Sequence, residues 1–107
     1  MRTWATLAII LTLASAAPAS ADLVNGSFEY DGTPFVYQAL PGGSLAIAGW
    51  TTTDSGVEWF QPTAYGDSPA PGGLYVVDIA NYVYSAGGVQ QTFATDPGSI
   101  YEVEFLL

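Results

Sequence analysis

Turn-forming residues interrupt this chain every eight to fifteen residues, and this spacing is the strongest constraint on its fold. Proline fixes φ and glycine permits positive φ, so clusters such as residues 41–43, 54–56 and 96–98 predict tight turns. The segments between the turns are rich in Val, Ile, Thr and aromatic residues, which favour β-strands. No mature segment has apolar residues at helical spacing between capping residues. We therefore expect an all-β fold of short antiparallel strands.

Seven strand-like segments follow from this pattern. They are residues 23–30, 35–39, 47–53, 57–61, 74–80, 88–94 and 99–107. In the sixth segment, Gln91 lies between the inward-facing Val89 and Phe93, so its amide should be buried and paired with the backbone, or should face a ligand. The last segment alternates apolar residues with Glu102 and Glu104, and this alternation predicts a strand with one solvent-exposed acidic face.

The first 21 residues have the layout of a cleavable secretion signal. A basic start at Arg2 precedes a charge-free run that ends in the small residues 19–21. The apolar part, residues 4–17, is shorter than the roughly 20 residues that span a bilayer. Residues 1–21 are therefore predicted to be a helical signal peptide that is cut after Ala21. The mature protein is then secreted or held at the cell surface.

The mature segment, residues 22–107, carries ten Asp and Glu residues and no Lys or Arg, because Arg2 lies in the leader. Its formal charge is therefore −10. Phosphate backbones are bound through Lys and Arg, so nucleic acid is excluded as a partner. The chain also lacks Cys and His, which removes disulfides, Ser-His-Asp triads and the usual zinc sites. A structural metal would have to be a hard cation held by oxygen atoms, such as calcium.

An ordered set of short motifs runs along the mature segment. The motifs are Asn25-Gly26-Ser27-Phe28-Glu29, Gly49-Trp50, Gly56-Val57-Glu58, Val76-Val77-Asp78-Ile79, Gly88-Val89, Gln91-Thr92-Phe93, Thr95, Pro97-Gly98, Tyr101 and Phe105. Together they resemble the choice-of-anchor C family, which is related to the plant cell-wall domain of unknown function six-four-two. The resemblance implies a galactose-binding-domain-like jelly roll, similar to several carbohydrate-binding modules. We therefore expect residues 22–107 to be the N-terminal part of one jelly-roll β-sandwich, incomplete at its C-terminus.

The first of these motifs bears on calcium. In similar jelly rolls the glutamate of this motif helps to hold a structural calcium ion, so the resemblance implies that role for Glu29. Asp31 lies nearby and could supply further oxygen ligands. The alternative is that Glu29 only accepts backbone hydrogen bonds at an edge of the fold.

Four aromatic residues are the predicted ligand-binding residues. Trp59 and Phe60 are adjacent, so a regular strand points them to opposite faces and one of them should be exposed. Tyr65, Tyr82 and Tyr84 lie on or near loops, where an amphipathic ring can contact a ligand. We therefore predict a sugar-binding platform from Trp59, Tyr65, Tyr82 and Tyr84, with ordinary half-buried packing as the alternative.

These features predict a non-catalytic, exported β-sandwich module that binds a neutral extracellular or cell-wall polysaccharide. A structural or adhesive surface protein without a small ligand is the second possibility. A glycoside hydrolase is the third, since two carboxylates such as Glu102 and Glu104 can in principle cleave a glycosidic bond. The alternation of the last segment argues against that third possibility, because it leaves both carboxylates on a solvent-exposed face.

Overall fold

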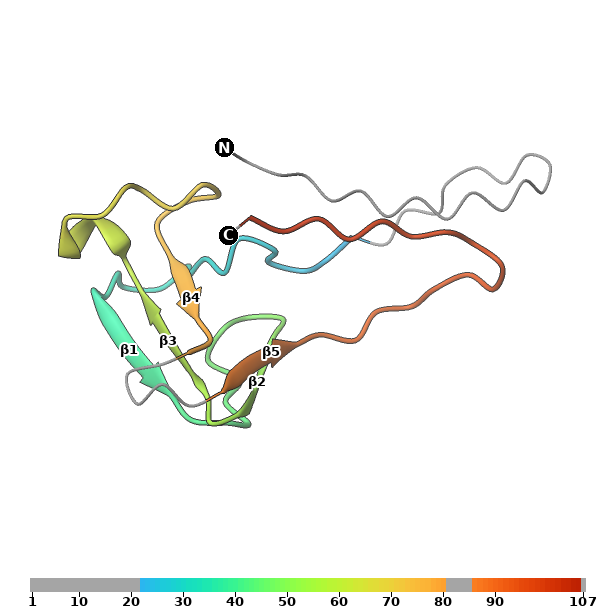
Figure 1. The fold of residues 1–107 in the computed structure, drawn as a ribbon, viewed down its shortest axis with the longest axis horizontal. Helices are drawn as coiled ribbons and strands as arrows, with labels where there is room; N and C mark the ends of the chain where they lie inside the picture. The colour runs from blue at the N-terminus through green and yellow to red at the C-terminus, as the bar shows by residue number, and fades with distance from the viewer. Residues whose placement is uncertain (1–21, 81–85, 107) are drawn as a thin grey trace.

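The computed structural model describes residues 22–80 and 86–106, which form two small antiparallel β-sheets (Figure 1). The first sheet contains β1 (Tyr37–Leu40), β3 (Val57–Phe60) and β4 (Val76–Asp78), in the order β1-β3-β4. The second sheet pairs β2 (Thr51–Asp54) with β5 (Gly87–Gln90). The prediction of an antiparallel β fold is confirmed at this level. Five of the seven predicted segments overlap a strand, and each strand is shorter than its predicted segment.

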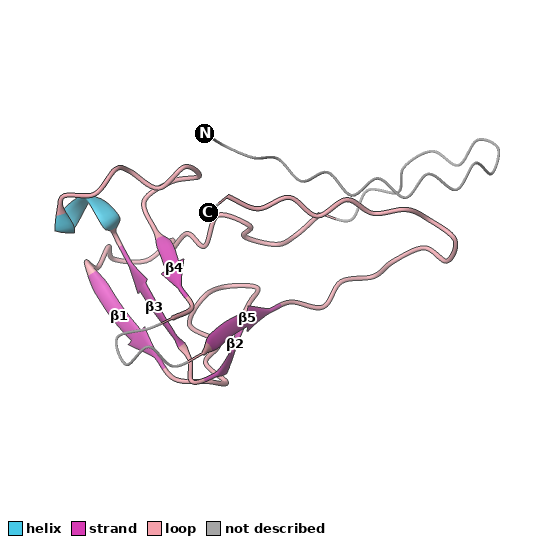
Figure 2. Ribbon diagram, in the orientation of Figure 1, coloured by secondary structure: helices cyan, strands magenta, loops and turns pink. Residues whose placement is uncertain are grey.

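Most of the described residues lie in loops and turns rather than in strands (Figure 2). The helical structure in the described ranges is a single 3-10 turn, η1 (Pro62–Tyr65), directly after β3. Across residues 22–80 and 86–106, no helix is long and apolar enough to cross a membrane. The predicted signal-peptide helix lies in residues 1–21, outside the described residues.

The chain passes from the second sheet to the first through the predicted turn at residues 54–56. Gly56 has φ of +83°, a left-handed backbone conformation that residues other than glycine rarely adopt. A Cβ atom at this position would also collide with the carbonyl oxygen of Leu40. Glycine is therefore required here by both the backbone conformation and the close approach of β1.

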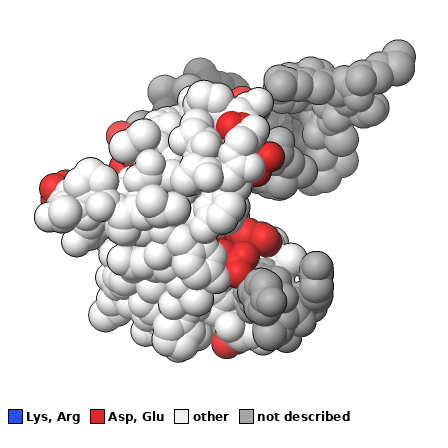
Figure 3. All heavy atoms as spheres, turned by 90° about the vertical axis from the view of Figure 1, so that its left-hand side faces the viewer, with Lys and Arg blue, Asp and Glu red and all other residues white. Residues whose placement is uncertain are grey.

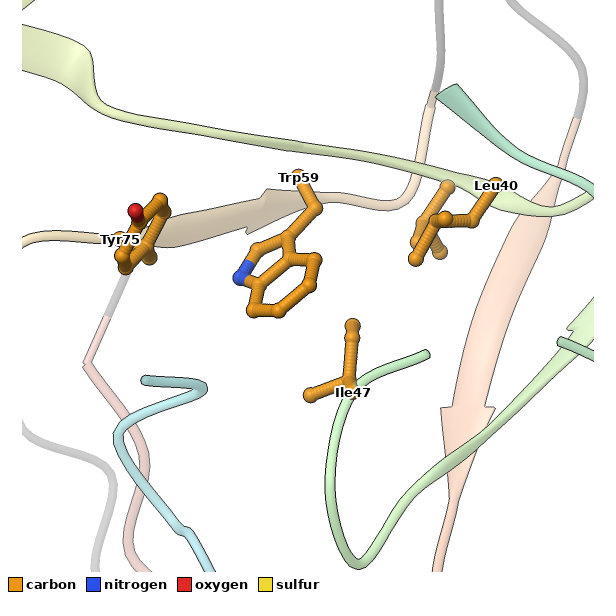
Figure 4. Packing of buried hydrophobic residues seen from close by; sticks show 5 residues of the cluster. Leu40, Ile47, Trp59 and Tyr75 are labelled. Atoms are coloured by element: carbon orange, nitrogen blue, oxygen red, sulfur yellow. The ribbon is translucent and has the colours of Figure 1, made fainter. Parts of the chain in front are cut away.

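The hydrophobic core lies against the inner face of the first sheet (Figure 4). Its buried members are Leu40, Ile47, Val57, Trp59 and Tyr75. Trp59 is 1% exposed, and its ring contacts Phe35 and Tyr75 at centroid distances of 4.7 and 5.4 Å. Aromatic rings bury large apolar areas, so a few of them stabilise a fold whose strands are only three or four residues long.

The strand predicted at residues 23–30 is wrong, because this segment forms a turn. Asn25 has φ of +50°, a conformation that Asn tolerates better than most residues. Its side-chain oxygen accepts from the Glu29 N–H at 2.8 Å, and its amide donates to the carbonyls of Glu29 and Ala48. The Asn25 side chain thus satisfies backbone groups that a strand would pair with a neighbouring strand.

The strand predicted at residues 99–107 is also wrong over the described part, which ends at residue 106. Residues 91–106 extend away from β5 and back without strand pairing to any described element (Figure 1). Val103 and Phe105 are each 72% exposed. Alternating sequence alone does not make a strand, because the backbone N–H and C=O groups of a strand need a paired neighbour.

Candidate functional site

Strand β3 presents different side chains on its two faces. Val57 and Trp59 are buried on the inner face, whereas Glu58 and Phe60 are half-buried on the outer face. This is the two-residue alternation of a regular strand, and it points a carboxylate and an aromatic ring the same way.

The pairing of β1 with β3 adds a tyrosine to this outer face. Tyr37 lies directly opposite Phe60 in the antiparallel register and is 41% exposed. Its hydroxyl donates a hydrogen bond to Oε1 of Glu58 at 2.7 Å, across the diagonal between the two strands. This bond orients the carboxylate and leaves its second oxygen, Oε2, able to accept from a ligand.

The 3-10 turn η1 and the residues directly after it bring two more side chains, Tyr65 and Asp67, to this outer face. Pro62 starts the turn, and Gly66 ends it with φ of +83°. Within the turn, the Tyr65 ring lies 5.7 Å from the Phe60 ring with their planes at 88°. The backbone N–H of Asp67 then donates to the carbonyl of Pro62 at 3.2 Å, which fixes the position of Asp67 after the turn.

These elements border an open pocket of about 630 Å³ at the surface. Its lining residues are Tyr37, Glu58, Phe60, Tyr65 and Asp67. The volume lies within the range of about 300–1,000 Å³ that is usual for small-molecule sites. Three aromatic rings provide apolar contact area, and two carboxylates provide hydrogen-bond acceptors.

The surface around the pocket is acidic or neutral. Figure 3 views the molecule from the side on which β1 and η1 lie in Figure 1, and its described atoms are only red or white. The one basic residue of the chain is Arg2, which lies outside the described residues. A ligand in this pocket therefore meets carboxylates and aromatic rings but no cationic side chain from the described residues.

The structure places Trp59 in the core and not at the predicted sugar-binding surface. The structure keeps the predicted regular strand but buries Trp59, and it turns the neighbouring Phe60 outward into the pocket. The indole N–H of Trp59 donates to the carbonyl of Phe28 at 2.8 Å, so its polar atom is also satisfied inside the fold. The larger apolar ring takes the core position because burying it removes more apolar surface from water.

Tyr65 lines the pocket, as a ligand-binding residue would, and it is 58% exposed. Tyr82 and Tyr84 lie outside the described residues. Sequence reasoning missed Tyr37, Glu58, Phe60 and Asp67, the other four lining residues. Once Trp59 is known to face inward, alternation along β3 identifies Glu58 and Phe60 as outward-facing. The position of Tyr37 depends instead on the register of β1 against β3, and that of Asp67 depends on the path of η1.

Glu29 has a structural role in this fold. Its Oε1 atom accepts hydrogen bonds from the backbone N–H groups of Leu74 and Tyr75, at 2.9 and 3.1 Å. Asp31 is exposed, and the described residues contain no group of three or more acidic side chains that could hold a metal ion. The contacts thus match the backbone-accepting alternative for Glu29, and they do not bring Glu29 and Asp31 together in a calcium site.

Gln91 also pairs with the backbone, as in the first of its two predicted alternatives, but its side chain is half-buried rather than buried. Its side-chain oxygen accepts from the Val24 N–H at 2.8 Å, and its amide nitrogen donates to the carbonyls of Val24 and Gly49, at 2.9 and 2.7 Å. One amide therefore joins three separate parts of the chain, and its hydrogen-bonding groups are used within the fold.

The comparisons with known proteins add no assignment to this geometry. The chain matches no protein-family model, no curated protein and no solved structure among those searched.

Proposed function

We propose that this chain is an exported, non-catalytic β-sandwich module that binds extracellular or cell-wall carbohydrate. The observation that carries the proposal is the pocket lined by three aromatic rings and two carboxylates on the outer face of the first sheet. The export part rests on the leader sequence, residues 1–21.

The lining of the pocket suits the two kinds of surface on a sugar ring. The rings of Phe60 and Tyr65 can cover the C–H face of a sugar. Because the two rings are perpendicular, one sugar ring could contact both of them. The carboxylates of Glu58 and Asp67 can accept hydrogen bonds from hydroxyl groups. Polyanionic glycans would be repelled by the same two carboxylates.

The fold supports a jelly-roll architecture without establishing its full topology. Two antiparallel sheets and a core against one of them are the elements from which such a sandwich is built. The sequence motifs that resemble the choice-of-anchor C family favour the same architecture. A jelly roll with its ligand site on a sheet face is therefore the architecture that we propose.

The carboxylates expected from the sequence for hydrolysis lie away from the pocket. Glu102 and Glu104 are exposed, lie on the extended segment after β5 and do not line the pocket. A glycosidase needs two carboxylates placed on either side of the scissile bond, and among the lining residues only Glu58 and Asp67 could serve, so an assay for released reducing ends tests that pair.

A binding titration tests the proposal. The mature protein recovered after export should begin at Asp22 and should bind soluble oligosaccharides from a panel, measured by calorimetry or NMR. Tyr65→Ala should weaken binding about tenfold, because it removes one stacking surface. Phe105→Ala is the matched control, since this ring is 72% exposed and lies outside the pocket. Failure to bind any oligosaccharide would instead favour a structural or adhesive protein.

A further inference from the structure

The charge of the pocket restricts the ligand further than its shape does. Glu58 and Asp67 both line the pocket, and none of its lining residues carries a positive charge. A neutral sugar that covers two carboxylates removes water from them and returns only hydroxyl hydrogen bonds. A cationic group on the ligand offsets that loss of hydration, because opposite charges attract more strongly as water is excluded.

The aromatic lining favours a cation for an independent reason. The face of an aromatic ring is electronegative and attracts ammonium groups that approach within about 6 Å of its centroid. Phe60 and Tyr65 stand at 88° to each other, and Tyr37 lies on the strand beside Phe60. Rings at different orientations around one pocket can contact a single cation from more than one side.

The hydrogen-bonding capacity of the site points to a donor-rich ligand group. Tyr37 uses its hydroxyl proton on Oε1 of Glu58, which leaves the Tyr65 hydroxyl as the remaining donor among the lining side chains. The Oε2 atom of Glu58 and the carboxylate of Asp67 can then only accept. An ammonium group has three N–H donors and no acceptor, and it complements this set more fully than a hydroxyl does.

We infer that the pocket selects sugars that carry a protonated amine, such as glucosamine units of an extracellular or cell-wall glycan, over neutral sugars of the same size. This inference rests on the proposed carbohydrate-binding function and names the class of sugar that the site prefers. In it, the aromatic rings contact both the sugar face and the ammonium group, and Glu58 and Asp67 provide the counter-charge.

A matched pair of ligands tests the inference. The probes are an oligomer of glucosamine and an oligomer of N-acetylglucosamine of equal length, which differ in the charge on nitrogen. At about pH 6 and low salt, we expect the glucosamine oligomer to bind about tenfold more tightly. This advantage should shrink as salt is added, and it should disappear above the pKa of the sugar amine.

Substitutions separate the pocket from the overall negative charge. Glu58→Gln and Asp67→Asn should each weaken binding of the glucosamine oligomer several-fold more than binding of the N-acetylated oligomer, and so remove most of the preference. Asp96→Asn and Glu102→Gln change the net charge equally at exposed positions outside the pocket, and the preference should survive them. If the preference for the glucosamine oligomer fell equally in the pocket variants and the control variants, it would reflect non-specific attraction to an acidic protein. That result would overturn the inference.

Two further results distinguish the inference from the function on which it rests. Equal affinity for the two oligomers would overturn the preference for an amine and leave carbohydrate binding in place. Absence of binding to both oligomers and to every neutral oligosaccharide would overturn the proposed function, and the inference with it. Binding of a lysine-containing peptide without binding of any glycan would also overturn both, since the pocket would then recognise a protein cation.

Discussion

The inner face of the sheet formed by β1, β3 and β4 buries Trp59 to 1% exposure, whereas the outer face leaves Tyr37 41% exposed. Both faces are rich in aromatic residues, so composition does not distinguish them. The difference lies in what surrounds the rings. On the inner face, rings contact other rings and the indole N–H bonds to the Phe28 carbonyl. On the outer face, the rings of Phe60 and Tyr65 border a pocket with two carboxylates.

Neighbouring residues of one short strand thus lie in separate environments, one in the core and one at the pocket. Trp59 and Phe60 are consecutive, yet one belongs to the core and the other to the pocket. Substitutions on the inner face should therefore change the free energy of unfolding, and substitutions on the outer face should change ligand affinity.

The largest effect is expected for Trp59→Ala. It should lower the free energy of unfolding by about 3–5 kcal/mol, because it empties the centre of the core and removes the hydrogen bond to the Phe28 carbonyl. Urea unfolding of the mature protein measures this loss. If the variant does not fold, Trp59→Phe keeps a ring in place and should give a smaller loss. An unchanged unfolding curve combined with lost glycan binding would instead show that Trp59 contacts the ligand.

A smaller loss is expected for Glu29→Ala. The Glu29 carboxylate accepts from the N–H groups of Leu74 and Tyr75 just before β4, and hydrogen bonds to charged groups contribute about 1.5–3 kcal/mol. The loss should be visible in urea unfolding and should be the same with added calcium or with a chelator. Asp31→Asn is the control and should have little effect, since Asp31 is exposed. Destabilisation of the unsubstituted protein by the chelator, absent in Glu29→Ala, would restore the calcium role.

Local chemistry in the sequence predicted the strands and turns that depend on neighbouring residues. The turn at residues 54–56 follows from Gly56, which must adopt positive φ. Strand β3 follows from its β-forming residues and forms nearly where expected. The Gln91 amide was expected to pair with the backbone because it lies between apolar residues, and it does. The turn and the strand need only residues close together in the chain, whereas the partners of the Gln91 amide, Val24 and Gly49, are distant in sequence.

The features that sequence reasoning missed depend on contacts between distant residues. Alternation shows that Trp59 and Phe60 face opposite ways, but which ring is buried depends also on the packing of Phe35 and Tyr75 around the indole. The register of β1 against β3, which brings Tyr37 to the pocket, is likewise not a local property. Residues 23–30 were predicted as a strand because the bonding of the Asn25 side chain to Glu29 and Ala48 was not foreseen.

On the outer face, Tyr37→Phe should have a modest effect on binding and almost none on stability. The substitution keeps the ring but removes the hydroxyl that holds the Glu58 carboxylate at 2.7 Å. Affinity for the best oligosaccharide of the panel should fall about threefold, as expected for one partly exposed hydrogen bond. The free energy of unfolding should stay within about 0.5 kcal/mol. A loss of stability as large as that of Glu29→Ala would mean that the outer face is part of the core.

The smallest effect is expected outside both faces, in the extended segment after β5. Val103 and Phe105 are each 72% exposed, and no described strand pairs with their segment. Val103→Ser therefore removes little buried area, so the free energy of unfolding should change by less than about 0.5 kcal/mol and oligosaccharide affinity should be unchanged. Because Val103 is more exposed than Tyr37, this substitution also tests whether exposure alone creates a binding surface. Urea unfolding and calorimetric titration of the variant measure the two quantities. A loss of more than about 1 kcal/mol in the free energy of unfolding would show that this segment packs in solution against part of the protein. The segment would then contribute to stability as the inner sheet face does.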